Sequence, residues 1–469
     1  MALSSLFTGP AERPWRFFQN ICSIPRPSGC EERLRRYLRD WSDGHGWPHR
    51  VDVAGNLVIC VPGLGAAAGA PTLVLQGHLD MVCEKNVDSE HNFMRDGIVA
   101  SVAGDWVVAD GTTLGADNGV AVALGCALVT EKLANRCPIE LLFTVDEEVG
   151  LTGAQKLDPS IVSGRQILNL DSEEDGVFTI SCAGGVDLQV KVPVELQTGH
   201  HDGWHAGVRG LRGGHSGVNI HEERANAIHV LADWLAALQV GVHSFHGGNK
   251  KNAIPREAYA LVSGCSESDL ERTRQTVQAS LANEPNVELY WHQVSVPHCR
   301  VGANIAKLIH ALPQGVLDWD PHCQGMVRTS ASLGVAAFSG EAIVLTMHGR
   351  SSSEAERERM VERVRTIAGA FGCGFHSDGD YPGWDPNPDS ALLTHAIAAY
   401  RECFGKSPVV KGIHAGLETG IIGKRVGTGE LLSVGPQIEN AHSPDERLHI
   451  ASFERTYAFL KQLVSRDWA

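Results

Sequence analysis

The stretch Leu141-Leu-Phe-Thr-Val-Asp-Glu-Glu-Val-Gly150 joins a buried-type strand to a run of acidic side chains. Its first half is apolar and β-prone, which is typical of a strand buried in a parallel sheet. Asp146, Glu147 and Glu148 follow at once, and carboxylates at the end of a buried strand are costly unless something compensates their charge. Taken alone, the acidic run is best interpreted as a surface turn. Its meaning depends on whether other strands end in the same kind of residue.

Other predicted strands also end in polar side chains. Two further apolar strands are predicted over 72–76 and 167–170, and a helix is predicted over about 120–133. Strands that alternate with helices and end in polar residues indicate an α/β sheet with its site at the strand ends. The polar residues at these ends, or just beyond them, are His78, Asp80, Asp117, Glu147, Glu148, Asp171 and His442.

This set of side chains indicates a metal site. Two imidazoles with several carboxylates suit Zn²⁺, and oxygen-rich sets also admit Mn²⁺ or Co²⁺. One metal needs about four ligands, so the set is large enough for two metals that share a bridging carboxylate. Each residue alone also has an ordinary interpretation: a lone His-x-Asp is usually incidental, and Asp117-Asn118-Gly119 alone is most often a turn or a helix cap. The prediction rests on their joint occurrence.

Local spacing separates the roles of neighbouring residues. His78 and Asp80 are two apart in an extended segment and face the same side, so Asp80 suits hydrogen bonding to an imidazole ligand. Glu147 and Glu148 are adjacent and are expected to diverge. One of them can then bind metal while the other takes a proton from an activated water.

Length and composition bound the class of protein. The 469 residues predict two or three domains, and the net charge of −15 argues against nucleic acid as a partner. We expect neither a signal peptide nor a membrane span, because no apolar run approaches the required length. The twelve cysteines are scattered singly, which indicates reduced thiols and a cytoplasmic location.

The sequence pattern changes twice, which predicts a separate module in the middle of the chain. Near Gly184 it changes to alternating strands and helices with the pattern of an α+β module, and Tyr381–Pro388 is rich in turn-forming residues and is interpreted as a linker. The predicted boundaries of the three segments are 1–184, 185–384 and 385–469. Near the start, Ser28 and Glu31 fit a capping box that opens a helix reaching about Trp41.

Several longer motifs resemble those of the two-zinc exopeptidases related to aminoacylase and carnosinase. These motifs are Gln76-Gly-His-Leu-Asp-Met81, Gly115-Ala-Asp-Asn-Gly119, Asp146-Glu-Glu-Val-Gly150, Asn169-Leu-Asp-Ser-Glu-Glu174 and Ala441-His-Ser-Pro-Asp-Glu446. The resemblance is closer still to the dipeptidases of this family that act on aminoacyl-histidine substrates. It extends to Ile24-Pro-Arg-Pro-Ser28, Cys182-Ala-Gly-Gly185, Gly210-Leu-Arg-Gly-Gly-His-Ser-Gly217, Asn252-Ala-Ile-Pro-Arg-Glu257, Tyr381-Pro-Gly-Trp384 and His414-Ala-Gly-Leu-Glu418.

The resemblance implies a fold and a role for each residue of the metal set. The fold would be α/β, with a mixed central sheet flanked by helices and an inserted α+β lid domain. Asp117 would bridge two metals, with His78 and Asp171 completing one site and Glu148 and His442 the other. Glu147 would be the general base and Asp80 the carboxylate that orients an imidazole. The bond between Asp117 and Asn118 would be a cis peptide.

The resemblance also implies substrate contacts in the insert and beyond it. His215 would hydrogen-bond the transition-state oxyanion, and Arg350 would bind the substrate α-carboxylate through a bidentate contact. Asn252 and Glu418 are weaker candidates for substrate contact. Taken alone, Arg350 is equally well interpreted as an ordinary surface or ion-paired arginine. Because relatives often supply the residue at the position of His215 from a partner subunit, the resemblance implies a homodimer formed through the lid.

The expected function is therefore hydrolysis of unblocked dipeptides, including Xaa-His and carnosine-type substrates, by water activated between two metals. An amidohydrolase acting on N-acyl amino acids and a tripeptidase are the alternatives that would use the same metals and base. A binding protein that keeps the fold without activity is a more distant alternative. The presence of all five ligands and Glu147 argues against it.

Overall fold

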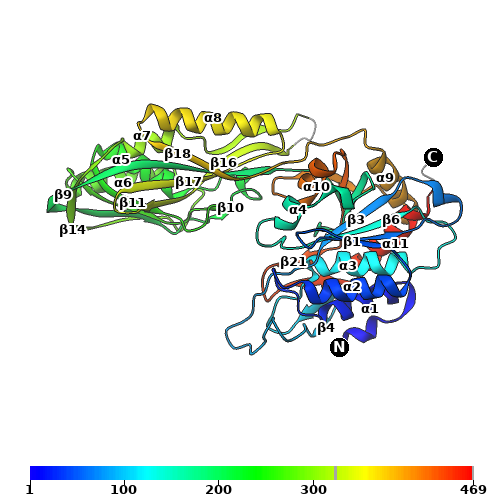
Figure 1. The fold of residues 1–469 in the computed structure, drawn as a ribbon. Helices are drawn as coiled ribbons and strands as arrows, with labels where there is room; N and C mark the ends of the chain where they lie inside the picture. The colour runs from blue at the N-terminus through cyan, green and yellow to red at the C-terminus, as the bar shows by residue number, and fades with distance from the viewer. Residues whose placement is uncertain (322–324, 467–469) are drawn as a thin grey trace. The chain divides into compact units, whose positions relative to one another are not determined.

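The computed structural model of the chain describes residues 1–321 and 325–466, which form two compact units. Unit 1 contains Met1–Ser181, Trp384–Gly412 and Leu417–Ala469, and unit 2 contains Cys182–Gly383 and Ile413–Gly416 (Figure 1). Each unit has its own sheet and its own apolar core. The short segment 413–416 joins unit 2 although it follows unit 1 residues in the chain, which nothing in the sequence indicated.

Unit 1 is built on a mixed eight-stranded sheet. Its strands, in spatial order, are β1 (His49–Val51), β2 (Leu57–Val61), β6 (Ile139–Thr144), β3 (Leu73–His78), β7 (Gln166–Asn169), β20 (Glu430–Ser433), β8 (Val177–Cys182) and β19 (Val409–Ile413). The central strands β6, β3, β7 and β20 are parallel to one another, whereas β2 and β8 on either side of them are antiparallel. Every residue of β3 and β6 is buried, as expected for strands covered on both faces.

Helices cover both faces of this sheet. They are α1 (Glu12–Cys22), α2 (Glu32–Gly44), α3 (Ala116–Val129), α4 (Thr152–Lys156), α9 (Ala391–Phe404), α10 (Glu418–Val426) and α11 (Ile450–Ser465). Successive residues of β3 face opposite sides: Gln76 bonds Glu418 of α10, whereas Gly77 abuts Ala121 of α3. A four-stranded sheet with the order β21 (Ile438–Glu439), β22 (Arg447–His449), β5 (Trp106–Ala109) and β4 (Ala100–Ala103) completes the unit.

The register of the parallel strands decides where the site lies. His78 of β3 is opposite Thr144 of β6, and Gln76 of β3 is opposite Asn169 of β7. The residues that follow these strands therefore emerge at one edge of the sheet. This edge receives the segments that carry Asp80, Glu147 and Asp171.

Unit 2 is an antiparallel sheet with helices on it. Its strands are β9 (Gly184–Arg209), β10 (Gly214–His215), β11 (Gly241–Gly247), β12 (Ala253–Ile254), β13 (Ala258–Ser263), β14 (Glu288–Val301), β15 (Gly315–Trp319), β16 (Val327–Phe338), β17 (Ala342–Ser351) and β18 (Gly374–Tyr381). The main path is β11-β13-β9-β17-β16-β15, and both β14 and β18 also pair with the long strand β9. The helices are α5 (Ala227–Leu238), α6 (Glu267–Ala279), α7 (Ile305–Ala311) and α8 (Glu354–Ala370).

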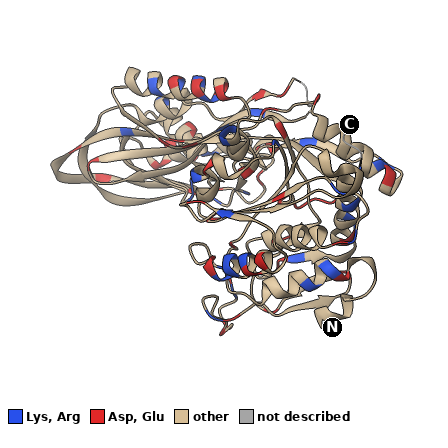
Figure 2. Cartoon of the chain, turned by 45° about the vertical axis from the view of Figure 1, so that its right-hand side comes forward, with Lys and Arg blue, Asp and Glu red and all other residues tan. Residues whose placement is uncertain are grey.

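Helix α8 carries acidic and basic side chains that pair with one another along the helix. Acidic and basic side chains alternate along it (Figure 2), and Arg359 pairs with Glu356 and Arg365 with Glu362, each three residues away. Such exposed pairs contribute little to stability. They keep the surface polar without forming a basic patch of the kind that nucleic acids require.

Two local predictions are wrong. The proposed capping box does not form, because Glu31 is itself the N-cap of α2 without a side-chain cap bond, and Ser28 instead donates to Asp80. The predicted linker is wrong at its start, because Tyr381 is the last residue of β18, although the chain does pass from unit 2 to unit 1 between Gly383 and Trp384. In both places a distant tertiary partner outweighs the local turn chemistry that the sequence displays.

Two observations concern the chain as a whole. Within the described ranges, no helix combines the length and the apolar character needed to cross a lipid bilayer. No two cysteines in the described part of the chain are joined by a disulfide.

Candidate functional sites

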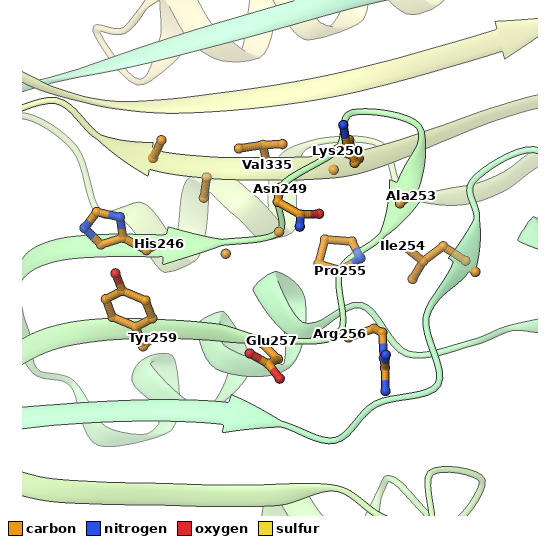
Figure 3. Close-up of a pocket in the computed structure, with 16 residues that line it drawn as sticks. His246, Asn249, Lys250, Ala253, Ile254, Pro255, Arg256, Glu257, Tyr259 and Val335 are labelled. Carbon is orange, nitrogen blue, oxygen red and sulfur yellow. The ribbon is translucent and has the colours of Figure 1, made fainter. Parts of the chain in front are cut away.

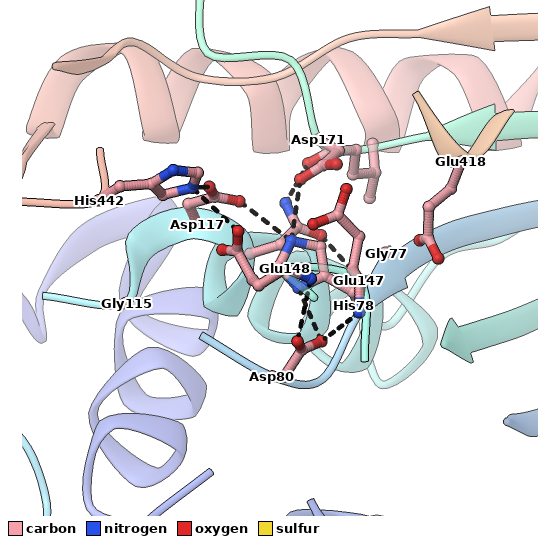
Figure 4. A network of polar contacts seen from close by, with 12 residues as sticks. Gly77, His78, Asp80, Gly115, Asp117, Glu147, Glu148, Asp171, Glu418 and His442 are labelled. Atoms are coloured by element: carbon pink, nitrogen blue, oxygen red, sulfur yellow. Dashed lines mark hydrogen bonds and ion pairs between the residues drawn. The ribbon is translucent and has the colours of Figure 1, made fainter. Parts of the chain in front are cut away.

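The strand-end residues of unit 1 converge into one polar cluster (Figure 4). His78 Nε2 lies 3.1 Å from Asp117 Oδ1 and 3.4 Å from Asp171 Oδ1. His442 Nε2 lies 3.0 Å from Asp117 Oδ2 and 3.0 Å from Glu148 Oε2. Asp117 therefore contacts both imidazoles, one through each carboxylate oxygen. Segments separated by more than 300 residues meet at this single side chain.

Ligand-type atoms in the cluster form three groups whose members all lie within 4.8 Å of one another. The groups are His78, Asp117 and Asp171; His78, Glu147 and Glu148; and Asp117, Glu148 and His442. Asp117 belongs to two of the groups, as does His78. Imidazole nitrogens and carboxylate oxygens at these separations fit divalent cations such as Zn²⁺.

The charges in the cluster are unbalanced without a cation. Burial raises the pKa of Asp171 to about 7 and raises the pKa of Glu147 well above its ordinary value. Glu148 Oε1 is buried without a hydrogen-bond partner. Hydrogen bonds that the His442 ring donates to Asp117 and Glu148 raise the pKa of His442 to about 11. Carboxylates that lie this close together repel one another when ionised, and therefore retain protons. Bound cations would offset this repulsion.

Asp80 is fixed beneath the cluster by four groups. Its Oδ1 accepts from the Glu147 N–H at 3.1 Å and lies 3.3 Å from His78 Nδ1. Its Oδ2 accepts from the Glu148 N–H at 3.2 Å and from Ser28 Oγ at 2.8 Å. Although burial opposes ionisation, the hydrogen bond with His78 and the other donors lower the pKa of Asp80 to about 2. An ionised Asp80 can therefore orient the His78 ring and anchor the acidic turn.

Glu147 and Glu148 differ in their partners, but they do not diverge as their adjacency predicted, since ligand atoms of both lie within 4.8 Å of each other and of His78. The Glu148 carboxylate pairs with His442, whereas the described residues offer the Glu147 side chain no hydrogen bond or ion pair. Both backbones are held by Asp80. One of the two carboxylates is thus tied to an imidazole and the other is free to exchange a proton.

Three supporting residues escaped the sequence analysis. Buried Arg26 donates to the carbonyls of Leu79, Asp80 and Gly115. Asn118 accepts from the His78 N–H at 3.2 Å and donates to the Leu170 carbonyl at 2.9 Å, and the Asp117–Asn118 peptide bond is cis. Glu446 accepts from the N–H groups of the Leu114–Asp117 loop. These residues stand within the quoted motifs, but which groups they bind could not be read from the motifs.

The close approach of α3 to β3 depends on a glycine. A Cβ atom on Gly77 would lie 2.3 Å from both Ala121 Cβ and Asn118 Oδ1. Because glycine lacks this atom, the Asn118 amide can reach the backbone of His78 and join the ends of β3 and β7. His442 is also constrained, since its φ of +64° lies in the left-handed region that few non-glycine residues adopt.

His215 and Arg350 meet in unit 2. Arg350, at the end of β17, is buried and lies with its Nη2 3.5 Å from His215 Nε2. His215 Nδ1 accepts from the N–H groups of Gly217 at 3.2 Å and Val218 at 3.0 Å, so the proton of the neutral ring is on Nε2. Burial and the Arg350 charge lower the pKa of His215 to about 4, which keeps this ring neutral near pH 7.

The two weaker candidates lie in different surroundings. Asn252 is exposed, and its carbonyl accepts from the Ser216 N–H at 2.9 Å, next to His215. Glu418 is fully buried in unit 1, where its Oε2 accepts from Gln76 at 2.7 Å and Thr144 at 2.6 Å. Burial raises the pKa of Glu418 to about 7. Figure 4 shows the Glu418 side chain apart from the residues around Asp117.

Unit 2 also contains a cavity of about 610 Å³ whose lining includes His246, Lys250, Ile254, Arg256 and Tyr259 (Figure 3). Its wall includes β12, which pairs with the strand that carries His215. Gly214 and residues 253–257, from two of the quoted motifs, line this cavity, but none of the candidate catalytic, metal or substrate-binding residues does. The candidate chemistry is therefore found elsewhere.

Comparison with known proteins shows full-length relatives. The chain is 33% identical over 467 residues to the cytosol non-specific dipeptidase of Escherichia coli, covering 96% of each chain. Its structure resembles that of the aminoacylhistidine dipeptidase of Vibrio alginolyticus with a TM-score of 0.88 and 32% identity, over 100% of this chain and 99% of the other. A tripeptidase of Staphylococcus aureus shares the fold with a TM-score of 0.58 at 17% identity, over 97% of each chain.

These matches agree with the resemblance seen in the sequence motifs and with the mixed α/β architecture. Residues 74–466, which include the whole strand-end cluster, match the peptidase family M20/M25/M40. A family match over most of the chain, together with a relative at 33% identity, establishes the family. The chain belongs to peptidase family M20/M25/M40.

Proposed function

We propose that the protein is a metal-dependent dipeptidase that holds two divalent cations in the strand-end cluster of unit 1. The observation that supports this most directly is the position of Asp117, whose two oxygens face His78 and His442 separately. Asp117 would bridge the cations, with His78 and Asp171 completing one site and Glu148 and His442 the other. Zn²⁺ is the proposed metal, and Mn²⁺ or Co²⁺ would suit the same donors.

Cations bound there would supply Lewis acidity that polarises the scissile carbonyl and acidifies a water molecule. Glu147 would take the proton of the attacking water and deliver it to the departing amine, acting first as general base and then as general acid. Burial raises the pKa of Glu147, which makes its carboxylate a stronger base than an ordinary glutamate. Asp80 would keep the His78 ring oriented and hold the backbone of Glu147 and Glu148 in place.

His215 and Arg350 of unit 2 are the proposed substrate contacts. The neutral His215 ring presents an Nε2–H donor, which suits an oxygen that gains negative charge in the transition state. The Arg350 guanidinium suits the free carboxylate of the substrate. Asn252 remains a weaker candidate for substrate contact. Glu418 remains one as well, although its bonds to Gln76 and Thr144 favour a supporting part in the sheet.

The proposed substrates are unblocked dipeptides, including Xaa-His and carnosine-type molecules. Two relatives that match nearly the whole chain are named as dipeptidases, and one is named for aminoacyl-histidine substrates. A carboxylate contact at a constant distance from the metals would act as a ruler that favours dipeptides over longer peptides. We further propose a cytoplasmic enzyme that forms a homodimer through unit 2, acting as a lid domain.

A panel of substrates tested against protein of known metal content would examine the proposal. Two metal equivalents and the highest kcat/KM on dipeptides are expected, with release of free histidine from Xaa-His. Equal kcat/KM values on dipeptides and tripeptides would contradict the ruler. A preference for N-acyl amino acids would indicate the amidohydrolase alternative, and metal loading without turnover on any member of the panel would indicate a binding protein.

A further inference from the structure

Four residues form a row across the sheet of unit 2. In the register of the strands, Tyr381 of β18 lies opposite Gly185 of β9, Gly185 lies opposite Arg350 of β17, and Arg350 lies opposite Ser330 of β16. Tyr381 and Arg350 are thus on the two strands that flank Gly185. Their side chains would be separated by the width of β9 if residue 185 carried a side chain of its own.

Two glycines make room for the Tyr381 ring. A Cβ atom on Gly185 would lie 2.4 Å from Tyr381 Cζ and from its hydroxyl oxygen, and one on Gly416 would lie 2.8 Å from Tyr381 Cε2. These distances are shorter than any real Cβ contact, so the ring occupies the space that both glycines leave open. The ring therefore crosses over β9 toward Arg350. Gly185 belongs to the motif Cys182–Gly185, which the proposed function does not otherwise use, and Gly416 belongs to the motif that ends in Glu418.

The Tyr381 hydroxyl meets the arginine at one end of its guanidinium. Its oxygen accepts from Arg350 Nη1 at 3.2 Å. This bond leaves Nη2 facing His215 Nε2 and leaves the buried Nε without a hydrogen-bond partner. On the opposite side, a Cβ atom on Gly217 would lie 3.0 Å from Arg350 Nε, so this backbone also limits where the guanidinium can turn.

The groups that Tyr381 leaves free are all donors. Arg350 Nη2 carries hydrogens, and the neutral His215 ring carries its hydrogen on Nε2, yet the two nitrogens are only 3.5 Å apart. Two donors cannot satisfy each other, whereas an acceptor oxygen placed beside them would satisfy both. The hydroxyl thus holds the guanidinium with its unused N–H groups turned toward the place where an acceptor belongs.

We propose that Tyr381 is a positioning residue: its hydroxyl, admitted by the glycines at 185 and 416, sets the direction of the Arg350 guanidinium for the α-carboxylate of a dipeptide. The inference rests on the proposed function of Arg350 and goes beyond it, since it names the group that decides which N–H pair of the arginine is presented. A positioning role predicts an effect on substrate binding rather than on the chemical step.

The test compares Tyr381→Phe with the unaltered enzyme on a dipeptide and on the corresponding dipeptide amide, which lacks the carboxylate. Loss of a hydrogen bond to a charged group should raise KM for the dipeptide about 10-fold. kcat should stay within about 2-fold, and KM for the amide should not change. The same substitution in an Arg350→Lys background should add nothing further.

Tyr290→Phe is the matched control. The Tyr290 ring also lies over a glycine of β9, since a Cβ atom on Gly207 would be 2.5 Å from Tyr290 Cζ, but Tyr290 stacks with Arg209 instead of bonding Arg350. Loss of the Tyr290 hydroxyl should leave KM for the dipeptide unchanged. Gly185→Ala supplies a second variant, which keeps the Tyr381 hydroxyl but displaces the ring and should also raise KM for the dipeptide.

The outcomes separate this inference from the proposed function. Wild-type KM in both Tyr381→Phe and Gly185→Ala would overturn the positioning role while leaving the dipeptidase intact. An equal rise of KM for dipeptide and amide would also overturn it, because the effect would not involve the carboxylate. If the unaltered protein cleaves no dipeptide, the proposed function fails first. In that case, calorimetry should compare dipeptide binding to the unaltered protein and to Tyr381→Phe. Equal Kd values for the two proteins would overturn the positioning role.

Discussion

The candidate sites of the two units contain unpaired polar groups of opposite kinds, acceptors in unit 1 and donors in unit 2. In unit 1, carboxylates crowd around His78 and His442, and Glu148 Oε1 is buried without a donor. In unit 2, Arg350 and His215 present N–H groups to each other, and Arg350 Nε is buried without an acceptor. Buried polar groups are normally paired, so the kind of group left unpaired indicates the ligand that each site suits. The first suits cations, and the second suits an anionic or carbonyl oxygen.

Removing the metal that the unit 1 site is proposed to bind should have the largest effect on activity. Treatment with a chelator should lower kcat/KM by at least about 100-fold, because without cations neither the carbonyl nor the water is activated. Metal content and activity measured together, before and after adding back Zn²⁺, Mn²⁺ or Co²⁺, would check the prediction. Full activity in metal-free protein would rule out the metal centre.

Glu147→Gln tests whether Glu147 takes the proton while Glu148 binds metal. The amide cannot take a proton from water, so kcat should fall by about 10²- to 10⁴-fold while the metal content stays the same. The matched control is Asp146→Asn, the same carboxylate-to-amide change in the same turn, where the φ of +51° also suits asparagine. A Glu147→Gln variant that keeps both metals and the wild-type rate would contradict the assigned base.

His215→Ala tests whether the donor site of unit 2 acts on charge that develops during the reaction. Loss of the Nε2–H should lower kcat by about 10²-fold. Since burial and Arg350 lower the pKa of His215 to about 4, the ring gains its proton only near and below that pH. The loss factor should therefore be constant from pH 5.5 to pH 8.

Rate profiles of the unaltered enzyme and His215→Ala across that pH range would measure the factor. His246→Gln, in the same unit but in the wall of the cavity described above, serves as the control and should change nothing. A factor that varies around pH 6.5 would show that the His215 ring titrates at its ordinary value and is not a constant neutral donor.

Ser28→Ala should give the smallest effect. It removes one of the donors to Asp80 and leaves the two backbone N–H groups in place, so the free energy of unfolding should fall by about 1 kcal/mol and kcat by a few-fold. Chemical denaturation and steady-state kinetics would measure both. The control Ser23→Ala removes an exposed hydroxyl bonded only to a local carbonyl, and it should match the unaltered protein. Equal effects of the two substitutions would show that Ser28 does not support Asp80.

Local patterns predicted the elements of unit 1 well, because buried strands and amphipathic helices are dictated by the chain itself. The strand around 72–76 and the one that begins the opening stretch are found as β3 and β6, within a residue or two of the expected bounds. Ser28 shows the limit of such reasoning. Its spacing to Glu31 satisfies a capping box, yet Asp80, 52 residues away, takes its hydroxyl.

The sequence alone predicted which side chains meet in the strand-end cluster, because carboxylates and imidazoles follow several buried strands at once. It also determined the resemblance to a peptidase family, which the comparisons confirm. Only the tertiary structure decided that Asp117 faces both imidazoles, that Ser28 and Arg26 hold the segment around Asp80, and that the Tyr381 ring crosses a glycine to reach Arg350. The reason is physical: residue type and spacing specify local chemistry, whereas the register between distant strands specifies which groups meet.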